Sequence, residues 1–138
     1  MNLADVIFLD VEDVEAAHAA SLRAFGGATG LRSRELLTSA VMAPRATWDG
    51  VPLYPSLAQV AATYAFGLAR NHAFLDGNKR TAFVAALAFL EINGVDLTLG
   101  NEWIAIMEGV AAGTVARENL VARFVDAMPA RDPVAIEP

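Results

Sequence analysis

The chain has 138 residues and no cysteine, which excludes disulfides and thiolate metal sites and suits a reducing compartment. Its net charge of −6 and its pI near 4.7 argue against a broad nucleic-acid-binding face. The length predicts one domain with one core, no signal-peptide pattern opens the chain, and the longest apolar run, Thr81 to Ile92, is too short to span a bilayer.

The N-terminal part predicts a helix followed by a loop. Asp10 is a suitable N-cap for a helix from Val11 to Phe25. His18 lies inside this helix, and because no other catalytic residue type surrounds it, we interpret it as a surface or core histidine rather than a second base. Gly26 to Arg32 contains three glycines, but their spacing is not G-x-G-x-x-G, which favours an ordinary loop.

The next segment predicts a second helix and then a turn. Ser33 can cap a helix over Arg34 to Ala43. Residues 45–55 are the least helical part of the chain, and Asp49-Gly50 is typical of a hairpin turn. Trp48 either belongs to a functional flap at this hairpin or is tucked into a surface loop for burial.

The remainder of the chain predicts four more helices. Ser56-x-x-Gln59 is a capping box for a helix over Leu57 to Asn71. Thr81 to Ile92 is apolar on nearly every face, which predicts a central core helix. Two helices are expected over residues 101–112 and 115–128, the second with Thr114 as its N-cap, and residues 129–138 are expected to form a disordered tail. The prediction is an all-α fold: a compact bundle of about six helices with a short hairpin-like flap, forming a single domain over residues 1–128.

The stretch from Asn71 to Arg80 combines a base, a carboxylate, an amide, a glycine and two cations. Such a loop, leading into the first turn of a helix, offers free N–H groups and the positive end of the helix dipole to an anion. Gly77 can adopt the positive φ that shapes these amides into a nest, and Asn78 is the expected N-cap. Lys79 and Arg80 add positive charge where a phosphate would sit.

Three further residues of this stretch complete a candidate site. Asp76 is the nearby oxygen group that can hold Mg²⁺, which usually binds through one or two carboxylates and phosphate oxygens. His72 is suited to take a proton from an attacking hydroxyl, and Phe74 is expected to pin the loop from its apolar side. These residues together predict a phosphate-handling active site.

The pattern His72-x-Phe74-x-Asp76-Gly77-Asn78-Lys79-Arg80 closely resembles the signature of the Fic/Doc superfamily in its Doc ("death on curing") form. Seven of its nine positions are specified, which makes a chance match improbable. The resemblance covers roughly residues 5 to 127 and includes, in order, Gly27-x-x-Gly30-Leu31-Arg32, Leu36-Leu37-x-Ser39-Ala40, Pro44 and Leu53-Tyr54-Pro55.

The resemblance implies an enzyme that uses ATP and Mg²⁺. His72 is then the general base, and Asp76 is the metal ligand. The residues implied to hold phosphate oxygens are Gly77, Asn78, Lys79 and Arg80, with Arg80 as a bidentate clamp. The resemblance also implies that the segment Thr47–Leu53 is a flap beside the active site that aligns the target peptide.

Departures from the Fic-type motif decide which reaction is expected. Lys79 stands in place of its second glycine, and Phe83 in place of its second arginine, which holds the outer phosphates during AMP transfer. The sequence therefore looks like Doc, which transfers the γ-phosphate of ATP to a threonine of translation elongation factor Tu. We expect a protein kinase of this type, a translation-inhibiting toxin of a type II toxin–antitoxin system. The alternatives are a Fic-type AMP transferase and a catalytically silent binding module.

Regulation is expected to come from a partner. Thr114 to Asn119 fits the pattern Ser/Thr-x-x-x-Glu-Gly/Asn of self-inhibited Fic proteins, but the arginine that Glu118 would need is Phe83 here. The resemblance instead implies a Phd-type antitoxin whose disordered C-terminal segment folds as a helix onto a groove beside the motif. Neither direct nucleic-acid binding nor membrane attachment is expected, and the expected location is the cytoplasm.

Overall fold

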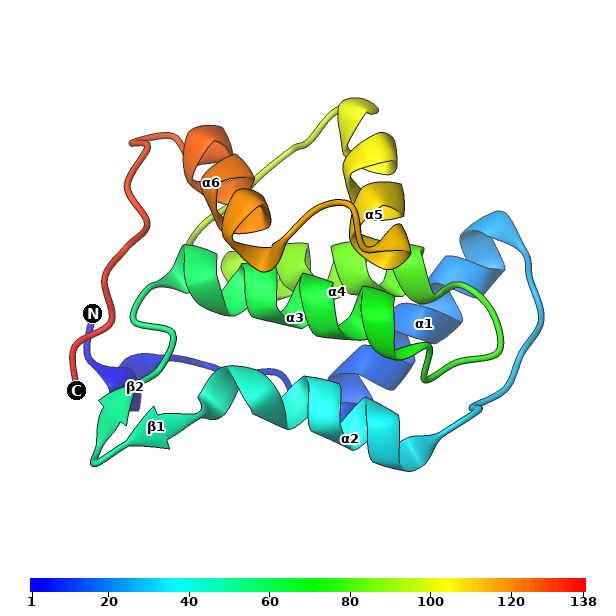
Figure 1. The fold of residues 1–138 in the computed structure, drawn as a ribbon, viewed down its shortest axis with the longest axis horizontal. Coiled ribbons are helices and arrows are strands. Elements are labelled where there is room, and N and C mark those ends of the chain that lie inside the picture. Colours follow the sequence, from blue (N-terminus) through cyan, green and yellow to red (C-terminus); the bar gives the residue numbers. More distant parts are fainter.

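The computed structural model describes residues 1–138 (Figure 1). Its α-helices are α1 (Val11–Phe25), α2 (Arg34–Met42), α3 (Leu57–Asn71), α4 (Asn78–Ile92), α5 (Glu102–Ala112) and α6 (Arg117–Ala127). Its shorter elements are the 3₁₀ helices η1 (Leu3–Asp5) and η2 (Ala43–Arg45) and the strands β1 (Thr47–Trp48) and β2 (Val51–Pro52). The predicted bundle of about six helices with a short hairpin is confirmed. None of the helices combines the length and apolar character that a membrane span requires.

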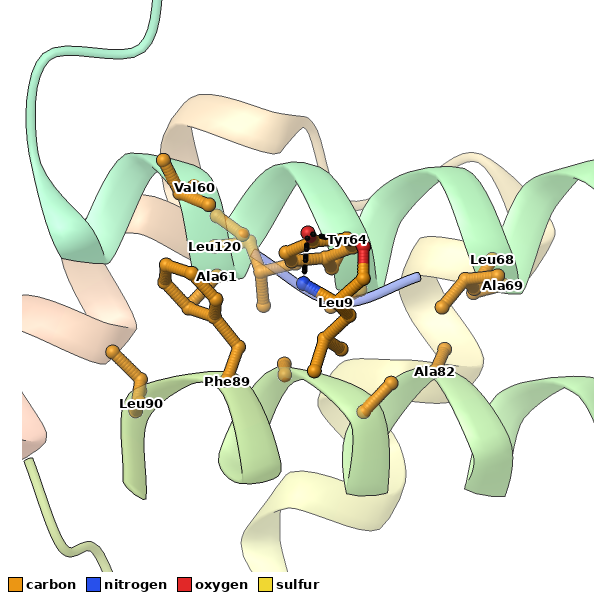
Figure 2. Close-up of a cluster of buried hydrophobic side chains, with 14 of the residues drawn as sticks. Leu9, Val60, Ala61, Tyr64, Leu68, Ala69, Ala82, Phe89, Leu90 and Leu120 are labelled. Carbon is orange, nitrogen blue, oxygen red and sulfur yellow. Dashed lines mark hydrogen bonds between the residues drawn. The ribbon is translucent and has the colours of Figure 1, made fainter. Parts of the chain in front are cut away.

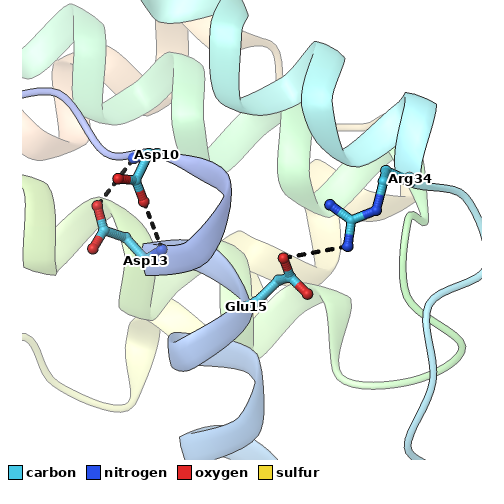
Figure 3. A network of polar contacts seen from close by, with 4 residues as sticks. All are labelled: Asp10, Asp13, Glu15 and Arg34. Atoms are coloured by element: carbon cyan, nitrogen blue, oxygen red, sulfur yellow. Dashed lines mark hydrogen bonds and ion pairs between the residues drawn. The ribbon is translucent and has the colours of Figure 1, made fainter.

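The start of α1 follows from its predicted cap. The Asp10 carboxylate accepts a hydrogen bond from Asp13 N at 2.9 Å, and the Asp13 carboxylate accepts one from Asp10 N at 3.0 Å. This reciprocal capping box satisfies two backbone donors and fixes where the helix begins (Figure 3). One turn further on, Glu15 pairs with Arg34 of α2 at 3.5 Å; because both side chains are substantially exposed, this pair contributes little stability (Figure 3).

The starts of α2 and α3 also follow their predicted caps. The Ser33 hydroxyl accepts from Leu36 N at 3.1 Å, and the Ser56 hydroxyl accepts from Gln59 N at 3.1 Å. The capping box predicted for α3 is only half formed. The Gln59 side-chain oxygen accepts a bond from the Ser56 hydroxyl, at 2.9 Å, instead of one from the Ser56 backbone N–H.

The helix α3 occupies the centre of the bundle and packs against α2, α4, α5 and α6. It has ten buried residues, whereas α4 has six and leaves Val84 38% exposed. The prediction that Thr81 to Ile92 forms the central core helix is therefore wrong, because α3 holds that place. The reason is the position of the two helices, since α3 is covered by α2, α4, α5 and α6, whereas α4 packs mainly on α1 and α3.

Tyr64 anchors the N-terminal segment to this centre (Figure 2). Its ring is fully buried and lies 5.3 Å from that of Phe89 on α4. Its hydroxyl accepts a hydrogen bond from Leu9 N at 2.9 Å and lies 3.4 Å from Leu9 O, to which it donates. The residues before α1 are thereby held against α3, which orients α1 along the core.

The predicted hairpin forms, but it lies at the far end of α3 from the motif. β1 and β2 pair antiparallel, with Trp48 opposite Val51, across an Asp49-Gly50 turn in which both residues have positive φ. Figure 1 shows this hairpin before the start of α3, while the motif follows the end of that helix. A helix of 15 residues is about 22 Å long, so α3 separates the two. The expected position beside the active site is wrong, because α2 leads away from the motif and only α3 returns to it. The alternative of a buried Trp48 is also wrong, since Trp48 is 78% exposed.

The last residues of the chain pack on the bundle. The carbonyls of Pro133 and Val134 accept hydrogen bonds of 3.2 and 2.9 Å from the first two N–H groups of α3. Ile136 is 4% exposed and belongs to the same hydrophobic core as the helices. The prediction of disorder for residues 129–138 is therefore wrong for this part of the tail. Residues 129–138 have no apolar periodicity, so the sequence pattern could not predict that they dock on the helices through single side chains and backbone carbonyls.

Candidate active site

The six predicted site residues lie in the turn between α3 and α4 and in the first turn of α4. His72 ends α3 in the left-handed conformation (φ 50°, ψ 48°), and Gly77 precedes α4 in the same region (φ 77°, ψ 15°). Ala73 and Phe74 between them are buried, while the His72 and Asp76 side chains are exposed. The loop is thus fixed from its apolar side and presents its polar groups outward, as predicted from Phe74.

The loop between α1 and α2 clamps the motif from outside. Arg32 N donates to Ala73 O at 2.7 Å, and Leu75 N donates to Gly30 O at 3.1 Å. The Arg32 guanidinium donates to the carbonyl of His72 at 2.7 Å, at the otherwise uncapped end of α3. What the sequence predicted to be an ordinary loop therefore positions the backbone that carries the general-base candidate.

Asp76 is held in a fixed orientation by two backbone donors. Its Oδ2 accepts from Ala28 N at 3.0 Å, and its Oδ1 accepts from Gly77 N at 2.8 Å. These two bonds, with a smaller contribution from the charge of Arg80, hold the pKa of the Asp76 carboxyl below its ordinary value. Gly27 makes the first bond possible, because a β-carbon there would stand 2.7 Å from Asp76 Oδ2. The carboxylate is therefore ionised and aimed before any ligand arrives.

Asn78 is part of the loop rather than the N-cap of α4. Its side-chain oxygen accepts from Phe74 N at 3.0 Å, and its side-chain nitrogen donates to Phe74 O at 2.9 Å. Gly77 occupies the N-cap position and cannot cap with a side chain, so the prediction of Asn78 as N-cap is wrong. The consequence favours an anion site: the backbone N–H groups of Asn78, Lys79 and Arg80 make no hydrogen bond within the protein.

The two cations beside these donors have no acidic partner. Lys79 and Arg80 are exposed, and neither forms an ion pair. The Arg80 guanidinium lies 4.8 Å from the ring centroid of Phe25, at the end of α1. The Arg80 side chain makes no hydrogen bond or ion pair within the protein, so this contact orients it while its N–H donors have no protein acceptor.

The position of the missing second arginine is filled by packing. The ring of Phe83 lies 5.7 Å from that of Trp103 on α5, and Trp103 lies 4.8 Å from Phe124 on α6. Glu118, the glutamate of the loose self-inhibition pattern, pairs with the neighbouring Arg117 at 3.0 Å. Thr114 does not cap α6 as predicted, since its hydroxyl donates to Gly109 O and Ala116 precedes the helix. The pattern therefore has no inhibitory contact within this chain.

Sequence reasoning missed the residues that support the motif from other elements. His18 of α1 lies under the loop, with Nε2 2.8 Å from Asp76 O and its ring stacked on Phe74 at 3.8 Å. A signal for it existed, because His18 falls with Val14 and Ser21 on the buried face of α1, where a polar ring needs a partner. No comparable signal in the sequence marks Ala28, whose contribution is a backbone N–H.

The donor set fits a magnesium ion only in company with a phosphate ligand. No three His, Asp or Glu side chains are arranged so that they could hold a metal ion, so the protein offers no complete metal cage. Asp76 supplies one exposed, ionised carboxylate next to three free N–H groups and two unpaired cations. Mg²⁺ characteristically binds through one or two carboxylates plus phosphate oxygens and water, which this arrangement allows.

Comparison with known proteins agrees with this geometry. A model of the Fic/DOC family matches residues 8–90, more than half of the chain, and the chain belongs to that family. Toxin Doc of Mycolicibacterium smegmatis is 52% identical over 90 residues, which cover 65% of this chain and 67% of that protein. Protein kinase doc of Escherichia phage P1 is 34% identical over 108 residues, covering 76% of this chain and 82% of that protein. The resemblance found in the motif is thereby confirmed.

Proposed function

We propose that this chain is a Doc-type toxin that transfers the γ-phosphate of ATP to a threonine hydroxyl of elongation factor Tu and so inhibits translation. The observation that carries the proposal is the start of α4, where three free N–H groups, Lys79 and Arg80 directly follow the ionised Asp76. The names of the two relatives, a toxin and a protein kinase, support the same reaction class.

The transfer requires little covalent chemistry from the protein. The threonine oxygen forms a bond to the γ-phosphorus while the bond from that phosphorus to the β–γ bridging oxygen breaks, and ADP leaves with the electron pair. His72 takes the hydroxyl proton, and Arg80 and the α4 N–H groups stabilise the charge on the phosphoryl oxygens. Mg²⁺ held by Asp76 and phosphate oxygens would neutralise further charge. Positioning and electrostatics supply most of the acceleration in such reactions.

The choice of γ-phosphate over AMP transfer rests on two residues. Phe83 packs on Trp103, so the position that holds the outer phosphates in AMP-transferring relatives offers no cation here. Lys79 adds an exposed, unpaired charge at the phosphate nest itself. We infer that ATP held by this nest and Arg80 has its terminal phosphate nearest His72, which is the orientation that phosphate transfer requires.

Intact-mass spectrometry of elongation factor Tu tests the proposal. The factor is incubated with this protein, ATP and Mg²⁺, and in parallel with the His72→Ala variant. The proposal predicts a gain of one phosphate group with the wild type and none with the variant. A gain of one AMP would establish the alternative reaction, and no gain at all would remove elongation factor Tu as the target.

We further propose that a Phd-type antitoxin restrains the toxin by laying a helix along the groove between α1 and α4. This groove, of about 370 Å³, is lined by Leu9, Asp13, Ala16, Ala17, Val84, Ala85, Ala88 and Ile92. It begins nearly two turns into α4 and runs away from the motif, so it is not the groove beside the motif that was expected. Seven of these eight residues are apolar, and an apolar groove between two helices suits an amphipathic helix. Action on elongation factor Tu and capture by such an antitoxin both imply a cytoplasmic protein.

A charge in this groove tests the antitoxin proposal. Val84→Glu is expected to weaken binding of the cognate antitoxin, measured by calorimetry, without abolishing phosphate transfer. Ile104→Glu is the matched control, because Ile104 is an exposed apolar residue on α5 that does not line the groove. Equal antitoxin affinity in the two variants would refute the groove as the docking site.

A further inference from the structure

His18 makes two contacts with the motif loop from a different helix and lies close to Gly77. Its Nε2 lies 2.8 Å from the carbonyl oxygen of Asp76, 58 residues away in the sequence. Its ring stacks on that of Phe74 with centroids 3.8 Å apart and an angle of 8° between the planes. Its Cδ2 and Nε2 would also be the neighbours of a β-carbon at Gly77, at 3.6 and 3.7 Å. One side chain therefore touches Phe74 and Asp76 and leaves little room for a side chain at Gly77.

The hydrogen bond has a defined direction and an enclosed setting. A carbonyl oxygen can only accept, so Nε2 carries the proton and donates it. His18 is 7% exposed, which limits competition from water for this bond. Because the Asp76 side chain is separately held by Ala28 N and Gly77 N, the donor on its carbonyl completes a three-point fixation of the residue.

We propose that His18 is a positioning residue for the active site: by donating from Nε2 to the Asp76 carbonyl, it sets the orientation in which the Asp76 carboxylate meets Mg²⁺ and the phosphate. This inference rests on the proposed function for its catalytic consequence, and on the contacts alone for its structural one. His18 does not touch the reacting atoms, so it differs in role from His72.

Two variants separate the hydrogen bond from the stacking. His18→Gln keeps an N–H donor at a similar reach and loses the ring, whereas His18→Phe keeps a stacking ring and loses the donor. Ser21→Ala is the matched control, since Ser21 is equally buried on the same face of α1 and its hydroxyl has no partner. Thermal unfolding of all three variants sets the temperature at which each is fully folded.

The catalytic readout is kcat/KM for phosphate transfer, measured as a function of Mg²⁺. Because a misplacement of about 1 Å can cost about 100-fold, we expect His18→Phe to lower kcat/KM by about 10- to 100-fold and to raise the Mg²⁺ requirement. His18→Gln and Ser21→Ala are expected to remain within about threefold of the wild type, the range of one modest hydrogen-bond difference. Equal losses in His18→Gln and His18→Phe would overturn the proposal.

A second readout does not depend on activity. The amide protons of Ala28 and Gly77 donate to the Asp76 carboxylate, so their NMR shifts report where that carboxylate lies. We expect these two shifts to change in His18→Phe and to stay near wild type in His18→Gln, and the imidazole nitrogen signals of the wild type to show a protonated Nε2. If the wild type transfers no phosphate, the proposed function fails while these spectra still decide the role of His18. Unchanged Ala28 and Gly77 shifts in His18→Phe would refute it.

Discussion

A methyl group at Gly27 is the smallest change that should displace the predicted metal ligand. The β-carbon of Gly27→Ala would stand 2.7 Å from Asp76 Oδ2, whereas ordinary contact begins at 3.4 Å, so the oxygen must retreat by about 0.7 Å. The hydrogen bond from Ala28 N to that same oxygen lengthens or breaks as a result. Since catalysis by positioning is sensitive to shifts of this size, we expect kcat/KM for phosphate transfer to fall by about 10- to 100-fold.

Gly26→Ala provides the control for backbone strain. Gly26 also has a positive φ, of 77°, but a β-carbon there would meet nothing within 4 Å. Both variants should therefore lose stability by about 1–3 kcal/mol from strain, measured by urea unfolding. Only Gly27→Ala should lose activity when both are assayed fully folded, with radiolabelled ATP and elongation factor Tu. Equal activity of the two variants would refute the claim that Gly27 makes room for the Asp76 carboxylate.

Three further predictions concern charge and pH. Because its pKa is lowered in the folded state, Asp76 contributes stability that is present above its ordinary pKa of 3.8 and is lost as pH falls through the lower folded value. The difference in unfolding midpoint between the wild type and Asp76→Asn should therefore be constant from neutral pH to about 4 and shrink only below pH 4. Phe25→Leu should raise KM for ATP by about 2- to 5-fold and lower the free energy of unfolding by no more than about 1 kcal/mol, since an exposed cation–π contact is worth about 0.5–1 kcal/mol. A lower KM would mean that the ring competes with phosphate for Arg80. Burial raises the pKa of Tyr64 to about 12, above its ordinary value of 10.0. The neutral side chain therefore contributes about 3 kcal/mol of stability that is present below pH 10 and is lost as pH rises from 10 to 12. Tyr64→Phe should remove this fall in the free energy of unfolding between pH 10 and 12.

Local signals in the sequence were sufficient for most helix boundaries. Asp10, Ser33 and Ser56 each accept the hydrogen bond expected of an N-cap, and α1 and α3 have the predicted bounds. These signals work because a cap satisfies donors within the same three or four residues. The start of α4 is the exception. Asparagine is a common capping residue, but the side chain of Asn78 bonds to the backbone of Phe74 instead of capping α4. The three-dimensional course of the loop decides between these two roles.

Contacts between distant segments could not be predicted in the same way. The chemistry of the site was visible in ten consecutive residues, yet its support comes from His18 and from the N–H of Ala28, both more than 45 positions away. The hairpin was predicted correctly as a local turn, while its place relative to the motif depends on the directions of α2 and α3. The docking of Ile136 likewise depends on the surface left open by the helices.

The central claim is that the terminal phosphate of ATP, and not AMP, is transferred. It is tested most directly by incubating elongation factor Tu and Mg²⁺ with this protein and ATP carrying a radioactive phosphorus at either the α- or the γ-position. The structure, with Phe83 packed on Trp103 and Lys79 at the nest, predicts that the factor acquires label only from the γ-labelled nucleotide. Label acquired from the α-labelled nucleotide would contradict the account.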